Sequence, residues 1–216
     1  MGFLCNVLAS IVAGIILLVG ASIFSKRMRR LLISILSHLL DIDIDYVFPN
    51  KKETEDDLEN EIDKAQFVYV FAGRGNELQR DPFNSLFLNR NKNIPTKILL
   101  PKTGISENEY DWLMQREKEL EKFDRAHGAG LLHQQVDNNA NFINRYTQDP
   151  KVELRRYNHP NIGRIIITDR CVFYTPYKEN AHGRHSRVYK FRKNGEIYYN
   201  FLRLFNQLWN SEQPTN

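Results

Sequence analysis

The sequence contains very little cysteine: Cys5 and Cys171 are the only two among its 216 residues. They lie in very different sequence surroundings, so we expect no disulfide between them. No spacing of cysteine and histidine resembles a structural zinc site, and we predict neither a metal nor a cofactor. Such low cysteine content fits a reducing cytoplasm. The sequence also has no internal repeat and no low-complexity segment.

Charge is missing between residues 3 and 24. A helix of that length spans the hydrocarbon core of a bilayer, which is about 30 Å thick. A cleaved signal peptide is the alternative, since "VGA" at 19–21 would suit the protease, but no basic residue precedes the apolar run. Basic residues follow it instead and should stay on the cytoplasmic side, namely Lys26, Arg27, Arg29 and Arg30. We therefore predict a retained transmembrane anchor over 1–25, in a single-pass protein of the cell (inner) membrane with its N-terminus outside.

Residues 26–64 are predicted to form an amphipathic juxtamembrane helix and an acidic linker. One polar face of this helix would hold Ser34, Ser37, His38 and Asp41, opposite a face of leucine and isoleucine. Such a helix lies at the inner leaflet or packs in an oligomeric bundle. Small residues in the anchor also favour packing against copies of itself, so we expect a homo-oligomer in the lipid bilayer. Residues 53–63 carry seven acids and no base, which indicates a short acidic helix that doubles as a linker.

Strand-like and helix-like segments alternate between residues 65 and 210, which we predict to form one cytosolic domain. Six strands are expected, at 66–71, 96–101, 152–157, 163–169, 171–177 and 186–191. Helices are expected at 82–90, at 106–123, from the "HGAG" segment to residue 146, and at 197–209. Strands mixed with helices indicate an α/β fold with a mixed sheet flanked by helices. The tail, 211–216, is expected to be disordered.

The order of these elements resembles that of the phospholipase D-like superfamily. The matching stretches are "FVYVFAGRGNEL", "KILLP", "VELRRYNHPNIGRIIITDRCVFYTPY" and "FLRLFNQLW", within residues 65–210. Active members carry the motif His-x-Lys-x4-Asp, in which the histidine attacks phosphorus and the lysine holds the phosphate oxygens. The resemblance therefore implies a phospholipase D-like mixed sheet flanked by helices, with a site built around this motif.

Alignment on the aspartate of the motif places Asp169 on that aspartate, Arg164 on the lysine and Ile162 on the histidine, so the nucleophile is missing. His159 could stand in, but residues five apart on a strand lie on opposite faces and about 16 Å away. Active members also need two such motifs, and the sequence holds no second one. The resemblance thus implies a degenerate site with no catalytic residue. If the domain is an enzyme, His159, Arg164 and Asp169 form the catalytic set; an ordinary buried strand is the remaining alternative.

A degenerate site can still bind phosphate. Arginine grips phosphate oxygens in a two-pronged manner, and Arg164 stands where the phosphate-holding lysine would be. The "AGRG" turn supplies Gly73, Arg74 and Gly75, and its glycines permit close approach of backbone N–H groups to an anion. The basic loop at 177–187 adds the candidates His182, Arg184, His185 and Arg187. A plain tight turn and a solvated basic surface loop are the alternative interpretations.

Metal ligation finds little support in the sequence. His182 and His185 have no carboxylate or cysteine near them at a supporting spacing. Asp124 and His127, three residues apart, are interpreted as a surface pair. Residues 151–216 hold twelve lysines and arginines against five acids. This excess would attract phosphates or an anionic membrane surface, and a solvated basic face is the alternative interpretation.

These features predict a membrane-anchored bacterial protein whose cytosolic domain is a pseudoenzyme. The domain would bind a phosphate-bearing ligand, such as a nucleotide or nucleic acid, and act as an effector or sensor in antiviral defence or stress signalling. The alternative is an active membrane-tethered phosphodiesterase of the nuclease or phospholipase D type, so whether the chain is an enzyme stays open. A scaffold that binds another protein is the third hypothesis.

Overall fold

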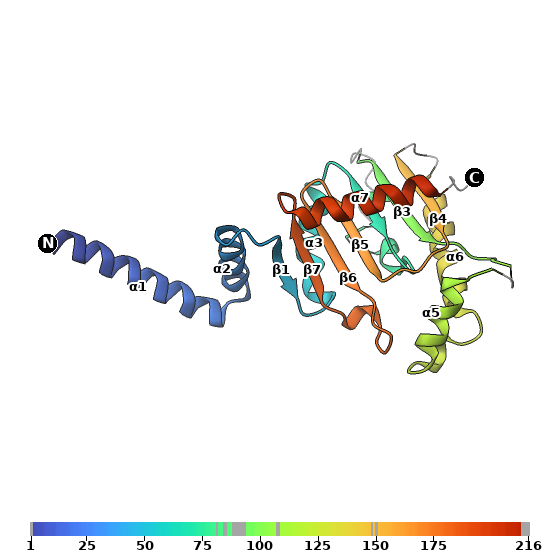
Figure 1. Cartoon of the computed structure of the whole chain (residues 1–216), viewed down its shortest axis with the longest axis horizontal. Helices are drawn as coiled ribbons and strands as arrows, with labels where there is room; N and C mark the ends of the chain where they lie inside the picture. Colours follow the sequence, from blue (N-terminus) through green and yellow to red (C-terminus); the bar gives the residue numbers. More distant parts are fainter. Residues whose placement is uncertain are drawn as a thin grey trace.

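A mixed seven-stranded sheet with helices on both faces forms the body of the protein (Figure 1). The computed structural model describes residues 2–80, 82–83, 86–87, 94–106, 109–147, 149 and 151–212, except for the side chains of 22–24. The expected fold class, an α/β mixed sheet flanked by helices and preceded by an apolar helix, is confirmed.

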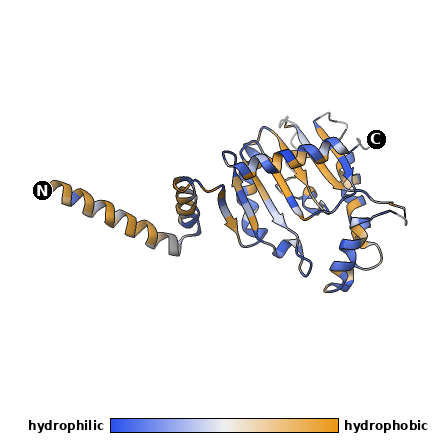
Figure 2. Cartoon of the chain, in the orientation of Figure 1, coloured by the Kyte–Doolittle hydropathy of each residue, from blue (hydrophilic) through white to orange (hydrophobic). Residues whose placement is uncertain are grey.

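Two helices precede the sheet. The first, α1 (Gly2–Phe24), extends away from the domain and is apolar along most of its length (Figures 1 and 2). Within the described residues, only its segment Gly2–Ala21 is long and apolar enough to cross a membrane. The second, α2 (Lys26–Leu39), begins after Ser25, whose side chain accepts a hydrogen bond from the backbone N–H of Met28.

The polar face of α2 packs against the domain. Ser34 Oγ donates to Asp45 Oδ1 at 2.6 Å, and Ser37 Oγ donates to the carbonyl oxygen of Ile42 at 2.8 Å. The apolar residues on the other side, such as Ile35 and Leu39, stay exposed. The amphipathic pattern is therefore present, but its polar side contacts protein and its apolar side faces outward.

The strand order in the sheet is β1-β7-β6-β5-β2-β3-β4. Three strands run parallel to one another: β2 (Val68–Phe71), β3 (Thr96–Pro101) and β4 (Val152–Tyr157). The other strands pair antiparallel. β5 (Gly163–Thr168) pairs with β2, β6 (Cys171–Pro176) pairs with β5, β7 (Val188–Arg192) pairs with β6, and β1 (Ile44–Phe48) pairs with β7. All six expected strands form, and β1 is a seventh that the sequence did not predict.

The fold therefore begins before residue 65, the expected start of the domain. Strand β1 is an edge strand of the sheet, and helix α3 (Glu55–Asp63) buries Leu58 and Ile62 in the core. The acids of α3 also have a structural partner, because Asp57 and Glu61 hold the ammonium group of Lys190 at 2.8 and 3.0 Å. The segment expected to be an acidic linker is thus packed against the sheet.

Two hydrophobic cores lie on opposite faces of the sheet. Helix α7 (Glu196–Ser211) covers one face (Figure 1) and buries Tyr198, Phe205 and Trp209, which share one side of the helix. Helices α3, α5 (Trp112–Glu121) and α6 (Leu131–Asn144) contribute to the core on the other face. Successive residues of a strand point to opposite faces, so Ile165 belongs to the α7 core and Ile166 to the other.

Some expected boundaries shift. The helix predicted from 106 begins at Trp112 because Asp111 caps it, with its side chain accepting from the backbone N–H of Met114 at 3.1 Å. Most of the helix expected at 82–90 lies outside the described residues, as does 213–216 of the expected tail. Both cysteines are free, as expected, with Cys5 exposed and Cys171 buried.

The first residue of β5 is expected to tolerate only glycine. A Cβ atom at Gly163 would lie 2.5 Å from the ring of Tyr174 and 2.7 Å from the backbone oxygen of Thr175. Gly163→Ala should therefore lower the free energy of unfolding by about 1–3 kcal/mol, the usual effect of overpacking. Urea unfolding of the detergent-solubilised chain measures this. Gly183→Ala is the control, because its Cβ would meet nothing closer than 3.5 Å; equal losses in both variants would contradict the argument.

Candidate functional site: a basic pocket at the sheet edge

A pocket of about 350 Å³ opens at the edge of the sheet where β2 and β3 end. The loop after β2, the start of β5 and the end of β6 form its floor, and α5 and the segments 124–127 and 182–184 form its walls. Ligands of open α/β sheets bind at the carboxyl ends of parallel strands, so this position is a natural one for a binding site.

Positive charge dominates the lining of this pocket. Two carboxylates line it, Glu77 and Asp124. Six cationic side chains line it as well: Lys51, Arg74, Arg80, Arg116, Arg164 and Arg184. A partly enclosed site with this excess of one sign of charge concentrates anions.

Arg164 lies at the floor of the pocket in a buried ion pair. Its Nη1 atom donates to Glu77 Oε1 at 2.7 Å, and its Nη2 atom donates to Thr175 Oγ1 at 3.0 Å. Lys51 Nζ approaches the other oxygen of Glu77 at 3.4 Å. Burial alone would raise the pKa of Glu77, but the charges of Arg164 and Lys51 outweigh it and lower the pKa to about 2. The charge of Arg164 is thus balanced by Glu77, and its guanidinium is held in a fixed position.

Arg74, in contrast, has no carboxylate within 4 Å among the described residues. Its Nη2 atom lies 3.1 Å from Nε2 of His127. Burial lowers the pKa of Arg74, because it penalises the charged guanidinium. An anion in the pocket would relieve this penalty.

The glycines beside Arg74 shape the loop. Gly75 has a φ of +82°, a conformation that L side chains rarely adopt. The backbone N–H of Gly73 donates to the hydroxyl of Tyr177 at 2.9 Å. The expected role of Gly73 as a backbone donor to an anion is therefore wrong for its N–H group, which already has a partner. Both glycines nevertheless line the pocket.

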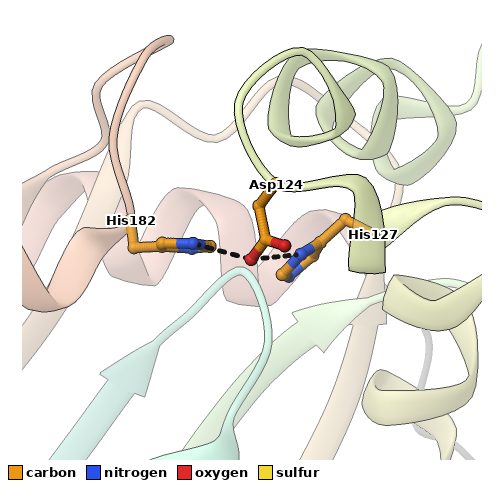
Figure 3. Close-up of side chains that lie close together, drawn as sticks. All are labelled: Asp124, His127 and His182. Atoms are coloured by element: carbon orange, nitrogen blue, oxygen red, sulfur yellow. Dashed lines mark ion pairs between the residues drawn. The ribbon is translucent and has the colours of Figure 1, made fainter.

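Three side chains meet in the wall of the pocket (Figure 3): Asp124, His127 and His182. Asp124 Oδ2 lies 3.2 Å from Nδ1 of His127 and 2.9 Å from Nε2 of His182. The expectation of a surface pair at Asp124 and His127 is wrong, because only 6% of His127 is exposed. Burial, followed by the charge of Arg184, lowers the pKa of His182, which favours its neutral form.

The proposed catalytic set does not come together. His159 does not line the pocket. Its partly buried ring stacks on Tyr157 and Phe71, at 4.7 and 5.9 Å between centroids, and these two residues belong to the core on the α7 face of the sheet. Arg164 points to the opposite face of the sheet, with Ile166. Asp169 follows the far end of β5 and accepts a hydrogen bond from the backbone N–H of Gln66 at 2.7 Å.

The fold places the candidate residues of the basic loop, 177–187, in two different surroundings. His182 and Arg184 line the pocket, whereas His185 and Arg187 are exposed outside it. Arg187 instead lines a second hollow beside α2, with Lys26 and Arg30. Arg116 of α5, which also lines the pocket, was not predicted from the sequence. Its position between Leu113 and Leu120, on the apolar side of that helix, was the signal that could have revealed it.

Comparisons with known proteins bear on the fold. No protein-family model and no curated protein sequence matches the chain. Among solved structures, the chain is similar to TrmBL2, an archaeal chromatin protein whose structure shows a novel mode of DNA binding. The two share 17% identity and a TM-score of 0.51, over 98% of this chain and 70% of that one.

Two further structures match less closely. Nuc from Salmonella typhimurium, a phospholipase D family member, shares 14% identity over 79% of this chain and 97% of that one, with a TM-score of 0.41. NucT from Helicobacter pylori shares 12% identity over 79% of this chain and 98% of that one, with a TM-score of 0.46. At such identities, likeness concerns the fold alone.

Removal of the buried carboxylate should destabilise the protein in a pH-dependent way. Glu77→Gln leaves Arg164 buried without its partner, which typically costs about 3–5 kcal/mol at pH 7. The folded pKa of Glu77 is about 2, below the ordinary value of 4.5, so the ionised carboxylate stabilises the fold above pH 4.5. That contribution is lost as the pH falls from 4.5 toward 2.

The measurement is urea unfolding of wild type and Glu77→Gln at pH 7, 4.5 and 3. The gap between their free energies of unfolding should shrink below pH 4.5, in line with the two pKa values of Glu77. Glu153→Gln, which changes an exposed carboxylate on β4, is the control and should follow wild type throughout. A gap that stays constant down to pH 3 would exclude the ionised pair as its source.

Proposed function

We propose that the chain is a membrane-attached protein whose C-terminal domain binds a phosphate-bearing ligand without cleaving it. The observation that carries this proposal is the charge of one pocket, with six cationic side chains against two carboxylates. Proteins bind phosphate with such clusters, because the planar guanidinium of arginine donates two parallel hydrogen bonds to a pair of phosphate oxygens.

The roles of the arginines differ. Arg164 and Arg116 are already bonded, Arg164 to Glu77 and Arg116 to Glu119 at 2.7 Å and to the carbonyl oxygen of Lys178 at 2.8 Å. They supply fixed positive charge around the ligand. Arg74 and the exposed Arg184 have donors that can turn to meet it. Arg74 is therefore the residue whose loss should weaken binding most cleanly.

Absence of cleavage is inferred from the motif. Ile162 occupies the position of the nucleophilic histidine and is 72% exposed. His159 contacts the core on the other face of the sheet from the pocket. The nucleophile of a phospholipase D-like reaction is thus missing from the place that the motif gives it. We propose a phospholipase D-like pseudoenzyme on this ground.

The ligand is proposed to be a nucleotide or another small phosphate ester. The volume of about 350 Å³ falls in the range of small-molecule sites. A duplex would need an extended basic groove, so a nucleotide fits the pocket better than double-stranded nucleic acid. Nucleic acid stays the second candidate, because the similar chain TrmBL2 is described by its DNA binding.

An effector role at the membrane would require the pocket to influence the anchor, and one short segment contacts both. Lys51 lines the pocket beside Glu77. Two residues further on, Glu53 pairs with Lys26 of α2 at 2.8 Å, and its carbonyl oxygen accepts from Arg30 at 2.9 Å. We propose that a ligand which draws Lys51 toward its phosphate shifts this segment, and with it α2. A role in antiviral defence or stress signalling would use this connection.

Arg74→Ala should weaken binding of the phosphate ligand by about 1.5–3 kcal/mol, the range for hydrogen bonds to charged groups. Calorimetric titration of the detergent-solubilised chain with nucleoside triphosphates, cyclic dinucleotides and short oligonucleotides measures this. Arg187→Ala is the matched control, because it removes an exposed arginine of the basic loop outside the pocket. Equal losses in both variants would mean non-specific attraction.

His159→Ala separates binding from catalysis. It should leave binding unchanged, and neither it nor wild type should hydrolyse these ligands. If wild type cleaves a phosphodiester and His159→Ala does not, the chain is an enzyme and the proposal of a pseudoenzyme is wrong.

The orientation of the anchor is testable as well. With basic residues only after the apolar run, the C-terminal domain should lie in the cytoplasm of the cell (inner) membrane. A reporter that fluoresces only in the cytoplasm should be active at the C-terminus, and one that works only outside should be silent there. The reverse result would overturn the orientation.

A further inference from the structure

We propose that Asp124, His127 and His182 bind a divalent transition metal ion, with Zn²⁺ as the best fit. Asp124 caps the short helix η3 (Arg125–His127), and His182 precedes η4 (Gly183–His185). These segments are far apart in the sequence, yet the fold brings the three side chains together in the pocket wall (Figure 3). The three residues line the same pocket as Arg164, but the proposal of a metal site does not depend on the proposed function.

The distances between the donor atoms suit one shared ion. Donor atoms of the three residues all lie within 4.8 Å of one another. Two of these separations are short, 3.2 Å from Asp124 Oδ2 to His127 Nδ1 and 2.9 Å from Asp124 Oδ2 to His182 Nε2. Ligands about 2.0–2.2 Å from a tetrahedral Zn²⁺ lie roughly 3.3 Å apart, so only small shifts are needed to admit the ion.

A second observation points independently to a ligand. Nδ1 of His127 is buried and makes no hydrogen bond within the described structure, although a carboxylate oxygen lies close to it. Only 6% of the residue is exposed, so water reaches it poorly. Buried polar atoms almost always have a partner. A metal ion between this nitrogen and Asp124 would supply one.

The identity of the donors selects the metal. Two imidazoles and one carboxylate suit Zn²⁺ and other late transition metals, whereas Mg²⁺ and Ca²⁺ prefer oxygen ligands. Three protein ligands leave a fourth coordination position open, as in catalytic zinc sites. All three residues line the pocket, so that position would be accessible from it.

Metal binding would also change the partner of Arg74. A ring that gives Nδ1 to a metal carries its proton on Nε2, where it can no longer accept from the guanidinium now 3.1 Å away. Two donors cannot stay face to face, so Arg74 would turn away from His127. Its guanidinium would then be free to meet an anion in the pocket.

Metal titration of the full-length chain in detergent tests the proposal, after treatment with EDTA and its removal. Co²⁺ should bind at one ion per chain and give the visible absorption of a four-coordinate site, and Zn²⁺ should displace it. Asp124→Asn and His182→Ala should each weaken Zn²⁺ binding by more than the roughly 10–100-fold known for groups that only support a ligand. His182 lies in a loop, so its variant stays informative even if Asp124→Asn fails to fold.

His185→Ala is the matched control, because it removes an exposed histidine of the same loop that lies outside the cluster of Asp124, His127 and His182. It should bind Zn²⁺ as wild type does. The proposal is overturned if wild type binds no Zn²⁺, if His182→Ala binds as well as wild type, or if His185→Ala loses affinity equally. Titration with cyclic dinucleotides in the presence of EDTA measures the anion affinity of the pocket separately.

Discussion

A guanidinium buried at the start of a central strand requires a carboxylate beside it, and Glu77 supplies that carboxylate to Arg164. The pair joins β5 to the loop after β2, while Thr175 brings in β6 and Lys51 the segment after β1. Each partner would be costly to bury alone, so the loop, the strands and the segment are held in one arrangement. The shape of the pocket follows from it.

The same arrangement sets where the residues of the proposed degenerate motif lie. The alternation of a strand carries Arg164 into the pocket and turns Ile165 toward α7. His159 lies in the loop between β4 and β5, and its ring stacks on Tyr157 on the other side of the sheet from the pocket. We propose that Arg164 and the cations around it keep the electrostatics of a phosphate site although the motif's histidine position is Ile162.

Strands can be predicted from local patterns in this sequence more readily than functional sites. Runs such as 163–168 carry their own signal, because they are short, apolar and rich in β-branched residues. Strand β1 was missed because the aspartates and isoleucines of residues 41–45 continue the amphipathic pattern of α2. Helix α3 was interpreted as a helical linker because the seven acids of residues 53–63 are typical of a solvent-exposed segment. Its partner Lys190 lies over a hundred residues away. The cluster of Asp124, His127 and His182 was likewise beyond local pattern, since only the tertiary fold brings His182 to the other two.

The short connection between α2 and β1 has a consequence for where the protein can act. Only residues 40–43 separate them, and α2, about 20 Å long, packs on the domain through Ser34 and Ser37. With α1 in a bilayer, this short connection would hold the domain close to the membrane surface. It would encounter other copies of itself by lateral diffusion in a plane, where confinement raises the effective concentration of weakly interacting partners well above that of the same molecules in solution.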